Sequence, residues 1–262
     1  MELIDTHCHL DFPVFDADRE ALLTRWRQLG VGEYIIPAVG EENWRRVMAL
    51  AERHDDIRYG LGIHPWYVDK QPRDALTRLE TLLASRPRGL VAVGECGLDL
   101  RSHVPQGGQV EMFEAQVRLA MAHALPLIVH SVRANDTVAK ILRRFTPPQG
   151  GVIHAFSGSL HQAEVFWQLG FRLGIGGVIS YERANKTREA IRQMPLEALL
   201  LETDAPDMPL QGQQGEVNTP ASLPTIARLL AQLRQQPLED VISVLHDSTR
   251  RLFPPGNHEI NI

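Results

Sequence analysis

The feature that most constrains the fold is a regular alternation of short apolar segments with amphipathic segments along the whole chain. The apolar segments are rich in β-branched residues, and eight can be counted, at residues 3–7, 33–39, 57–64, 90–95, 126–130, 151–156, 171–177 and 198–204. Near-continuous apolar strands that alternate with helices are typical of a parallel sheet covered on both faces. Eight such units in 262 residues predict an α/β fold, a (β/α)8 TIM barrel that forms a single domain over residues 1–262.

The amphipathic segments have helical spacing and recognisable ends. Residues 16–30 place Leu22, Trp26 and Leu29 on one face. Residues 218–234 begin with Asn218 or Thr219 as a candidate cap and carry an apolar stripe, and residues 237–253 form another amphipathic helix. The alternative fold, an open doubly wound sheet, would need a glycine-rich phosphate loop after an early strand, and residues 6–12 contain no glycine.

Polar side chains capable of binding metal follow six of the eight predicted strands. They are His7 and His9, His64, Glu95, His130, His154 and Asp204. In a parallel barrel the carboxyl ends of all strands open onto one mouth, where active sites are built, so we expect these side chains to meet. Imidazoles and carboxylates gathered in a buried mouth are costly unless a cation compensates them. The pattern therefore predicts a metal centre.

Six residues are the candidate metal ligands: His7, His9, Glu95, His130, His154 and Asp204. Six ligands exceed the four of a tetrahedral zinc site and suit two ions that share a bridging carboxylate. Glu95 is the expected bridge, with His7, His9 and Asp204 on one ion and His130 and His154 on the other. The four imidazoles favour zinc or manganese over magnesium.

Two divalent cations about 3.5–4 Å apart can activate water and stabilise both oxygens of a phosphoryl displacement. In this hypothesis Glu95 and Asp204 are the catalytic residues, with Asp204 as the base. Glu202 shares the parity of Asp204 and is expected to hold a ligand or water by hydrogen bonds; a buried pair with an arginine is the alternative.

Charge and cysteine content limit the other properties. The net charge is −5 and the chain has no lysine-rich tract, so contact with nucleic acid should be local rather than along a long strand. Cys8 and Cys96 fit buried thiols in a reducing compartment. The sequence shows no secretory signal and no long apolar run, which predicts a cytoplasmic protein without membrane or obligate protein partners.

Six separated motifs resemble the TatD family of metal-dependent hydrolases and deoxyribonucleases. In order they are THCHLD, GIHPW, GECGLD, VHS, IHAFSG and LETDAP. The resemblance covers essentially the whole chain. It implies a TIM barrel, a divalent-metal centre at the six candidate ligands, and hydrolysis of phosphodiester bonds, with trimming of DNA from a 3′ end. Short single-stranded DNA, or RNA, would be the substrate.

Three departures from the family pattern weaken the inference to DNA. The chain reads GECGLDL where GEIGLDY is expected, Arg133 stands three places after His130 rather than two, and Glu216 and Val217 precede the asparagine of the last loop.

On the substrate side, His64 is expected to donate to a phosphate oxygen and Arg133 to contact a phosphate. Trp66 and Tyr67 could stack on a base or simply pack their loop.

Two other functions remain open. The first is hydrolysis of a cyclic amide or lactone by an amidohydrolase-type centre, which often uses a carboxylated lysine as the bridge; here Glu95 occupies that place. The second is a metal-binding scaffold protein without catalysis, which would need a closed coordination shell.

Overall fold

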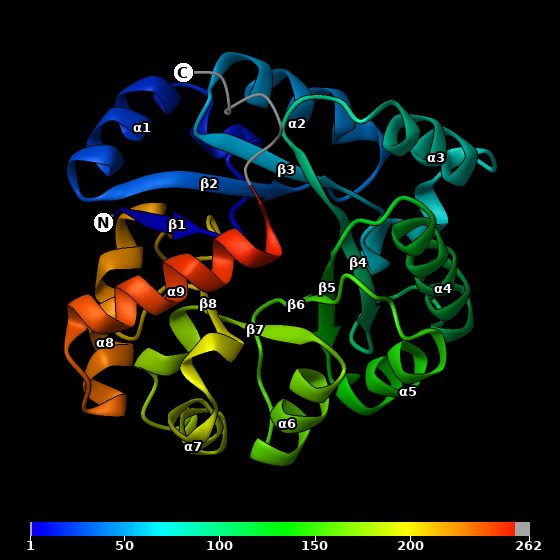
Figure 1. The fold of residues 1–262 in the computed structure, drawn as a ribbon. Helices are drawn as coiled ribbons and strands as arrows, with labels where there is room; N and C mark the ends of the chain where they lie inside the picture. The colour runs from blue at the N-terminus through cyan, green and yellow to red at the C-terminus, as the bar shows by residue number, and fades with distance from the viewer. Residues whose placement is uncertain (1, 255–262) are drawn as a thin grey trace.

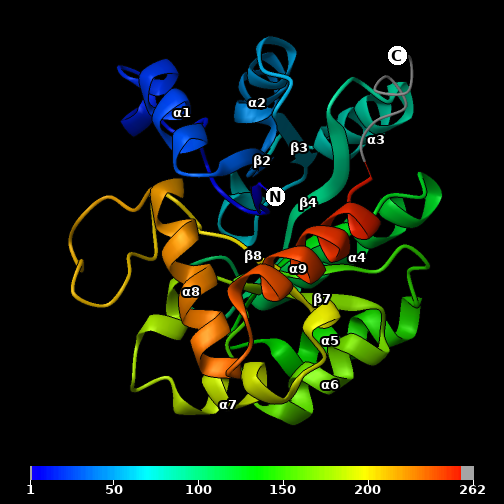
Figure 2. The same cartoon turned by 60° about the vertical axis from the view of Figure 1, so that its left-hand side comes forward.

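The protein is described from a computed structural model, in which residues 2–254 can be placed. Eight parallel strands form one sheet in sequential order (Figures 1 and 2). The strands are β1 (Leu3–Asp5), β2 (Val31–Pro37), β3 (Ile57–Leu61), β4 (Leu90–Asp99), β5 (Leu127–Val132), β6 (Gly151–Ile153), β7 (Phe171–Ile175) and β8 (Leu199–Leu201). Each lies within or overlaps a predicted apolar segment. The (β/α)8 barrel is confirmed.

Helices surround the strands. They are α1 (Arg19–Gln28), α2 (Glu41–Arg53), α3 (Ala75–Ser85), α4 (Gln106–Ala122), α5 (Asn135–Phe145), α6 (Leu160–Gln168), α7 (Asn185–Gln193), α8 (Leu223–Arg234) and α9 (Leu238–Leu252). Short 3-10 turns lie at η1 (Pro13–Phe15), η2 (Pro65–Lys70), η3 (Gly177–Ser180), η4 (Leu196–Ala198) and η5 (Pro220–Ser222). No helix within residues 2–254 is both long and apolar enough to cross a membrane.

Backbone hydrogen bonds join the segment after β1 to the last residue of β8 and to the segment after β8, and bring the two ends of the sheet together. The Thr6 amide donates to the Leu201 carbonyl over 3.0 Å, and the Asp204 amide donates to the His7 carbonyl over 2.9 Å. Residues near the start of the chain are thereby held beside residues some two hundred positions later. This closure places His7 and Asp204 at the same rim.

The barrel interior is filled by its own apolar cluster. Its members come from β2, β4, β5, β6 and β8 and from the end of α9: Ile35, Val91, Ala92, Ile128, Val152, Leu200, Leu252 and Phe253. A larger apolar cluster packs the outer face of the sheet against the helices. Leu252 and Phe253 close the amino-terminal end of the barrel, where Arg58 donates to the Phe253 carbonyl and pairs with Glu33.

Two expected element boundaries differ in the structure. The first strand stops at Asp5 rather than His7, because the Asp5 carboxylate accepts hydrogen bonds from the backbone amides of His7 and Thr203 and turns the chain out of the ladder. The helix expected from residue 218 begins at Leu223, after the 3-10 turn η5. Asn218 does not cap it; its Nδ2 donates to the Thr203 carbonyl over 2.8 Å and its Oδ1 accepts from Ser222 Oγ.

Candidate metal centre

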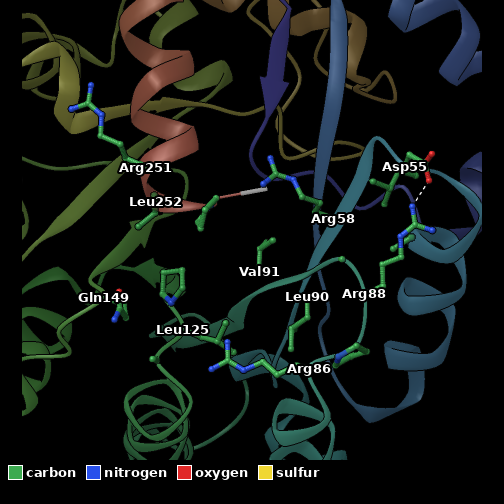
Figure 3. A pocket seen from close by; sticks show the side chains of 17 residues that line it. Asp55, Arg58, Arg86, Arg88, Leu90, Val91, Leu125, Gln149, Arg251 and Leu252 are labelled. Atoms are coloured by element: carbon green, nitrogen blue, oxygen red, sulfur yellow. Dashed lines mark hydrogen bonds and ion pairs between the residues drawn. The ribbon is translucent and has the colours of Figure 1, made fainter. Parts of the chain in front are cut away.

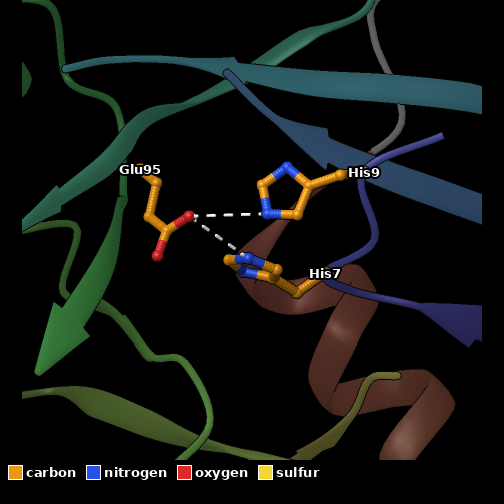
Figure 4. Close-up of side chains that lie close together, drawn as sticks. All are labelled: His7, His9 and Glu95. Carbon is orange, nitrogen blue, oxygen red and sulfur yellow. Dashed lines mark ion pairs between the residues drawn. The ribbon is translucent and has the colours of Figure 1, made fainter. Parts of the chain in front are cut away.

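The structure brings all six candidate ligands to one mouth at the carboxyl ends of the strands. Five of them, His9, Glu95, His130, His154 and Asp204, line a cavity of about 350 Å³, and His7 lies buried beneath it. Figure 4 shows how the His7 and His9 rings converge on Glu95 from the segment after β1. Their ring centroids are 5.2 Å apart and the planes are nearly perpendicular. The parallel ends of distant strands thus assemble one polar cluster.

Glu95 lies between two groups of imidazoles. Its Oε2 is 3.4 Å from His7 Nε2 and 3.7 Å from His9 Nε2. Its Oε1 is 2.8 Å from His130 Nδ1 and 3.6 Å from His154 Nε2. Each carboxylate oxygen therefore faces a different set of nitrogen atoms.

A glycine lets β4 and β5 approach closely beside Glu95. Gly97 has φ +135°, and a Cβ atom there would lie 2.1 Å from the His130 carbonyl oxygen. A side chain at this position would push the strands apart. The glycine therefore helps to keep Glu95 and His130 within contact.

Asp204 completes the side of the cluster that holds the first two histidines. Its Oδ1 lies 3.5 Å from His7 Nε2 and 3.8 Å from His9 Nε2, and its Oδ2 lies 4.0 Å from His154 Nε2. Burial raises the pKa of Asp204 to about 6, against the opposing effect of His154 and His9. Its carboxylate is thus ionised at neutral pH but close to its titration.

Two further carboxylates fix the orientation of the histidines. His130 turns Nδ1 toward Glu95 and Nε2 toward Asp99 Oδ2, 3.1 Å away. His154 turns Nε2 toward Glu95 and Nδ1 toward Glu202 Oε1, 3.2 Å away. Carboxylates placed behind imidazoles in this way select the tautomer whose free nitrogen faces a metal.

Glu202 occupies space that a glycine leaves. A Cβ atom at Gly174 of β7 would lie 2.0 Å from Glu202 Oε2. Glu202 Oε1 also accepts the Ala155 backbone N–H. The hydrogen bond to His154 agrees with the expected orienting role, and no arginine contact of Glu202 is found among the described residues.

The donor set fits a divalent cation. Within residues 2–254, both ring nitrogens of His7 and Nδ1 of His9 are buried without a hydrogen-bond partner. Three groups of side chains offer ligand atoms close enough to share an ion: His7, His9 and Glu95; His7, His154 and Glu202; and His64, Glu95 and His130. Burial lowers the pKa of His7, against the opposing effect of Glu95, so the ring is neutral and one of its nitrogens has a lone pair free to coordinate. Buried nitrogen and carboxylate donors that lack partners are what a bound cation would satisfy.

Comparisons with known proteins agree with this geometry. The family described as TatD related DNase matches residues 4–254. The chain belongs to the TatD family.

The sequence similarity to relatives of this TatD protein extends over nearly the full length of both chains. The uncharacterized metal-dependent hydrolase YjjV of Escherichia coli K12 is 47% identical over 251 residues, 95% of this chain and 97% of that protein. The crystal structure of YjjV superposes with a TM-score of 0.93, covering 96% of this chain and 97% of that chain. A protein of Pantoea ananatis named 3′-5′ ssDNA/RNA exonuclease TatD is 30% identical over 259 residues, 96% of this chain and 99% of its own length. The TatD protein described here is therefore a member of a family of metal-dependent hydrolases.

The two expected substrate contacts of the TatD protein lie in different places. His64 is at the rim of the metal centre, with Nε2 3.6 Å from Glu95 Oε1. Its Nδ1 accepts the Trp66 backbone N–H over 3.1 Å, so the ring proton of neutral His64 sits on Nε2. Arg133 lies outside the cavity that the candidate ligands line and instead lines a neighbouring cavity.

Sequence reasoning missed Asp99. This residue ends β4, is 2% exposed, and accepts from Trp66 Nε1 over 2.8 Å as well as contacting His130. The apolar run expected as the strand ends at Glu95, so Asp99 lies beyond the predicted strand end. Its position four residues after Glu95, an even number along a strand, was the available signal, since such residues share a face. The Trp66 indole N–H therefore helps to hold the Asp99 carboxylate in place.

Proposed function

We propose that this TatD protein is a phosphodiesterase with two divalent cations that removes nucleotides from the 3′ end of short single-stranded DNA or RNA. The observation that carries the proposal is Glu95, whose two oxygens face separate groups of imidazoles at 2.8–3.7 Å. One ion would use His7, His9 and Asp204, and the other His130 and His154, with Glu95 between them. Zinc or manganese suits these ligands better than magnesium.

Two bound cations would supply a water of lowered pKa and neutralise charge on the phosphoryl oxygens. Asp204, with its pKa raised to about 6 by burial, is suited to accept the proton of the attacking water near neutral pH. His64 is suited to donate from Nε2 to a phosphate oxygen, because burial lowers its pKa to about 3, against the opposing effect of Glu95, and Nδ1 is engaged with Trp66. Asp99 and Glu202 hold the rings of His130 and His154 in position.

Nucleic acid as the substrate class rests on the family and on one relative's name. The Pantoea ananatis protein is named an ssDNA/RNA exonuclease. The net charge of −5 argues that contacts are confined to a few phosphates near the mouth. Short single strands fit this limit better than long duplexes.

A panel of substrates tests the proposal. Single-stranded DNA, single-stranded RNA, a bis-aryl phosphodiester and a dihydropyrimidine are each incubated with the protein, once with manganese and once with a chelator. Metal-dependent cleavage of the phosphodiesters, with loss of label first from the 3′ end of the strands, is the expected result. Hydrolysis of the dihydropyrimidine without any phosphodiester cleavage would favour the amidohydrolase alternative, and binding of metal with no turnover would favour the scaffold.

A further inference from the structure

A second cavity adjoins the metal centre. It has a volume of about 770 Å³ and is formed by the loops after β5 and β6 and by the first turns of α5 and α7. The two cavities share five lining residues: Arg101, Ser131, Val132, Ala155 and Met208. A molecule bound at the metal centre can therefore extend into this second cavity, called here the side groove, without leaving the surface.

The side groove is strongly positive. Its lining includes four cationic side chains, Arg101, Arg133, Arg183 and Lys186, and one carboxylate, Asp136. Asp136 already accepts a hydrogen bond from Gln162 Nε2 over 2.8 Å. The concentration of cations is unusual in a chain with a net charge of −5 and only three lysines. Such a concave basic surface attracts an anion.

Hydrogen bonds fix the floor of the side groove. The Thr187 hydroxyl accepts the Gly158 backbone N–H over 3.2 Å, and Asn135 Nδ2 donates to the Ser157 carbonyl over 3.0 Å. Arg133 follows β5 directly and has φ +55°, a left-handed conformation uncommon for arginine. The basic side chains thus project from a backbone whose shape is set before any ligand arrives.

Most arginines of the cavity at the opposite end of the barrel are paired with other groups of the protein. This cavity has a volume of about 830 Å³ (Figure 3). Arg88 pairs with Asp55, Arg86 donates to the His123 carbonyl, and Arg58 pairs with Glu33. Those three arginines are engaged with the protein itself, and the cavity is separated from the metal centre by the barrel interior.

We propose that the side groove binds a second phosphate group of the substrate, next to the phosphodiester held at the metal centre. This inference rests on the proposed phosphodiesterase function. A compound with one phosphate would occupy only the metal centre, whereas one with two would also engage Arg183 and Lys186. The protein would then prefer substrates that carry at least two phosphates.

Kinetics with substrates of increasing phosphate number test the inference. The series comprises a bis-aryl phosphodiester, a dinucleotide, the same dinucleotide with a terminal phosphate, and a trinucleotide, all with manganese. A lower KM is expected for the last two than for the unphosphorylated dinucleotide. A lower KM for the trinucleotide alone shows that the groove binds an internucleotide phosphate. A lower KM for the phosphorylated dinucleotide alone shows that it binds a terminal phosphate. Equal KM values for all three would overturn the inference.

The variant Arg183→Gln/Lys186→Gln removes two exposed charges of the side groove. It should raise the KM of the two-phosphate substrates roughly tenfold and leave kcat and the kinetics of the aryl phosphodiester unchanged. The matched control is Lys140→Gln/Arg228→Gln, which removes the same two charge types from exposed positions on α5 and α8 outside the groove. An unchanged KM, or equal losses for the one-phosphate and two-phosphate substrates, would reject the groove as a subsite.

A binding measurement separates this inference from the proposed function. Fluorescence anisotropy of a labelled trinucleotide is recorded in chelator, where no turnover occurs. The groove variant should bind about tenfold more weakly than the wild-type protein and the control variant. If the wild-type protein cleaves no phosphodiester, the proposed function fails while this difference in binding still decides whether the groove takes a phosphate. Identical binding by all three proteins would overturn it.

Discussion

Asp99 Oδ2 lies 3.1 Å from His130 Nε2, on the side of the ring opposite Glu95. The same oxygen accepts the Trp66 indole N–H over 2.8 Å. Although burial opposes it, the hydrogen bond from His130 is the leading cause that lowers the pKa of Asp99, so the carboxylate is ionised and can hold the imidazole N–H.

Replacing Asp99 should weaken the binding of one cation. Asp99→Ala removes the group that orients His130 and should reduce the metal affinity about 10-fold to 100-fold, the usual cost of losing a carboxylate behind a ligating histidine. Competition titration against a chromophoric chelator measures the affinity. Asp69→Ala, at an exposed aspartate that contacts His103, is the control. Equal affinity in both variants would show that Asp99 does not position the ligand.

Glu95→Ala should abolish turnover while the fold remains intact. The change removes the carboxylate that contacts four of the imidazoles through its two oxygens. We expect an unchanged circular dichroism spectrum, and fewer than two metal ions per chain by elemental analysis. Manganese-dependent activity retained in this variant would count against Glu95 as the bridge.

His64→Ala should separate substrate contact from metal binding. Because Nδ1 of His64 accepts from Trp66, Nε2 carries the proton and is a donor rather than a metal ligand. Loss of a hydrogen bond to a charged phosphate should lower kcat/KM for phosphodiesters about 10-fold to 100-fold. The metal content should stay at the wild-type value, and a loss of metal would instead assign His64 to the coordination sphere.

Metal affinity should fall as the pH falls. Burial lowers the pKa of His154, but the carboxylates of Asp204, Glu202 and Glu95 outweigh it and raise the value to about 10 in the metal-free protein. Below pH 10 a cation must displace this proton, so the dissociation constant should rise roughly tenfold for each unit of lower pH. Below about pH 6 the protonation of Asp204 should steepen the dependence. Titration calorimetry in buffers of different ionisation enthalpy counts the released protons, and a pH-independent affinity would contradict the assignment.

Asn218→Ala should destabilise the protein. Asn218 is 3% exposed, donates to the Thr203 carbonyl and accepts from Thr219 N and Ser222 Oγ. Leaving these buried groups unpaired costs about 1–3 kcal/mol. Urea unfolding measures the loss, and Asn185→Ala, at an exposed asparagine of α7, should change the free energy of unfolding by much less.

Much of the fold could be predicted because each strand lies within or overlaps a largely apolar run. The six candidate ligands could also be found, since each closely follows or lies within such a run and all strand ends of a parallel barrel share a rim. Asp99 was missed because β4 continues to residue 99, past the end of the apolar run at Glu95, and only its even spacing from Glu95 indicates that it shares a face with that residue.

Hydrogen-bond directions could not be predicted either. Whether His64 presents a proton or a lone pair depends on the Trp66 backbone N–H, and which nitrogen of His130 faces Glu95 depends on Asp99. These relations arise from side-chain rotamers and loop paths that the order of residues does not specify. The side groove is a further case, because its cations come from separate loops and from the first turn of α7.

The hydrogen bonds that join the segment after β1 to the end of β8 and the segment after it also determine when the metal centre can form during translation. Thr6 and Leu201, which pair at this seam, are 195 positions apart. During translation His7 and His9 leave the ribosome early, whereas Asp204 follows only after all eight strands have emerged. A nascent chain therefore cannot assemble all six candidate ligands until the last strand is out, and an unfinished polypeptide lacks the complete metal centre.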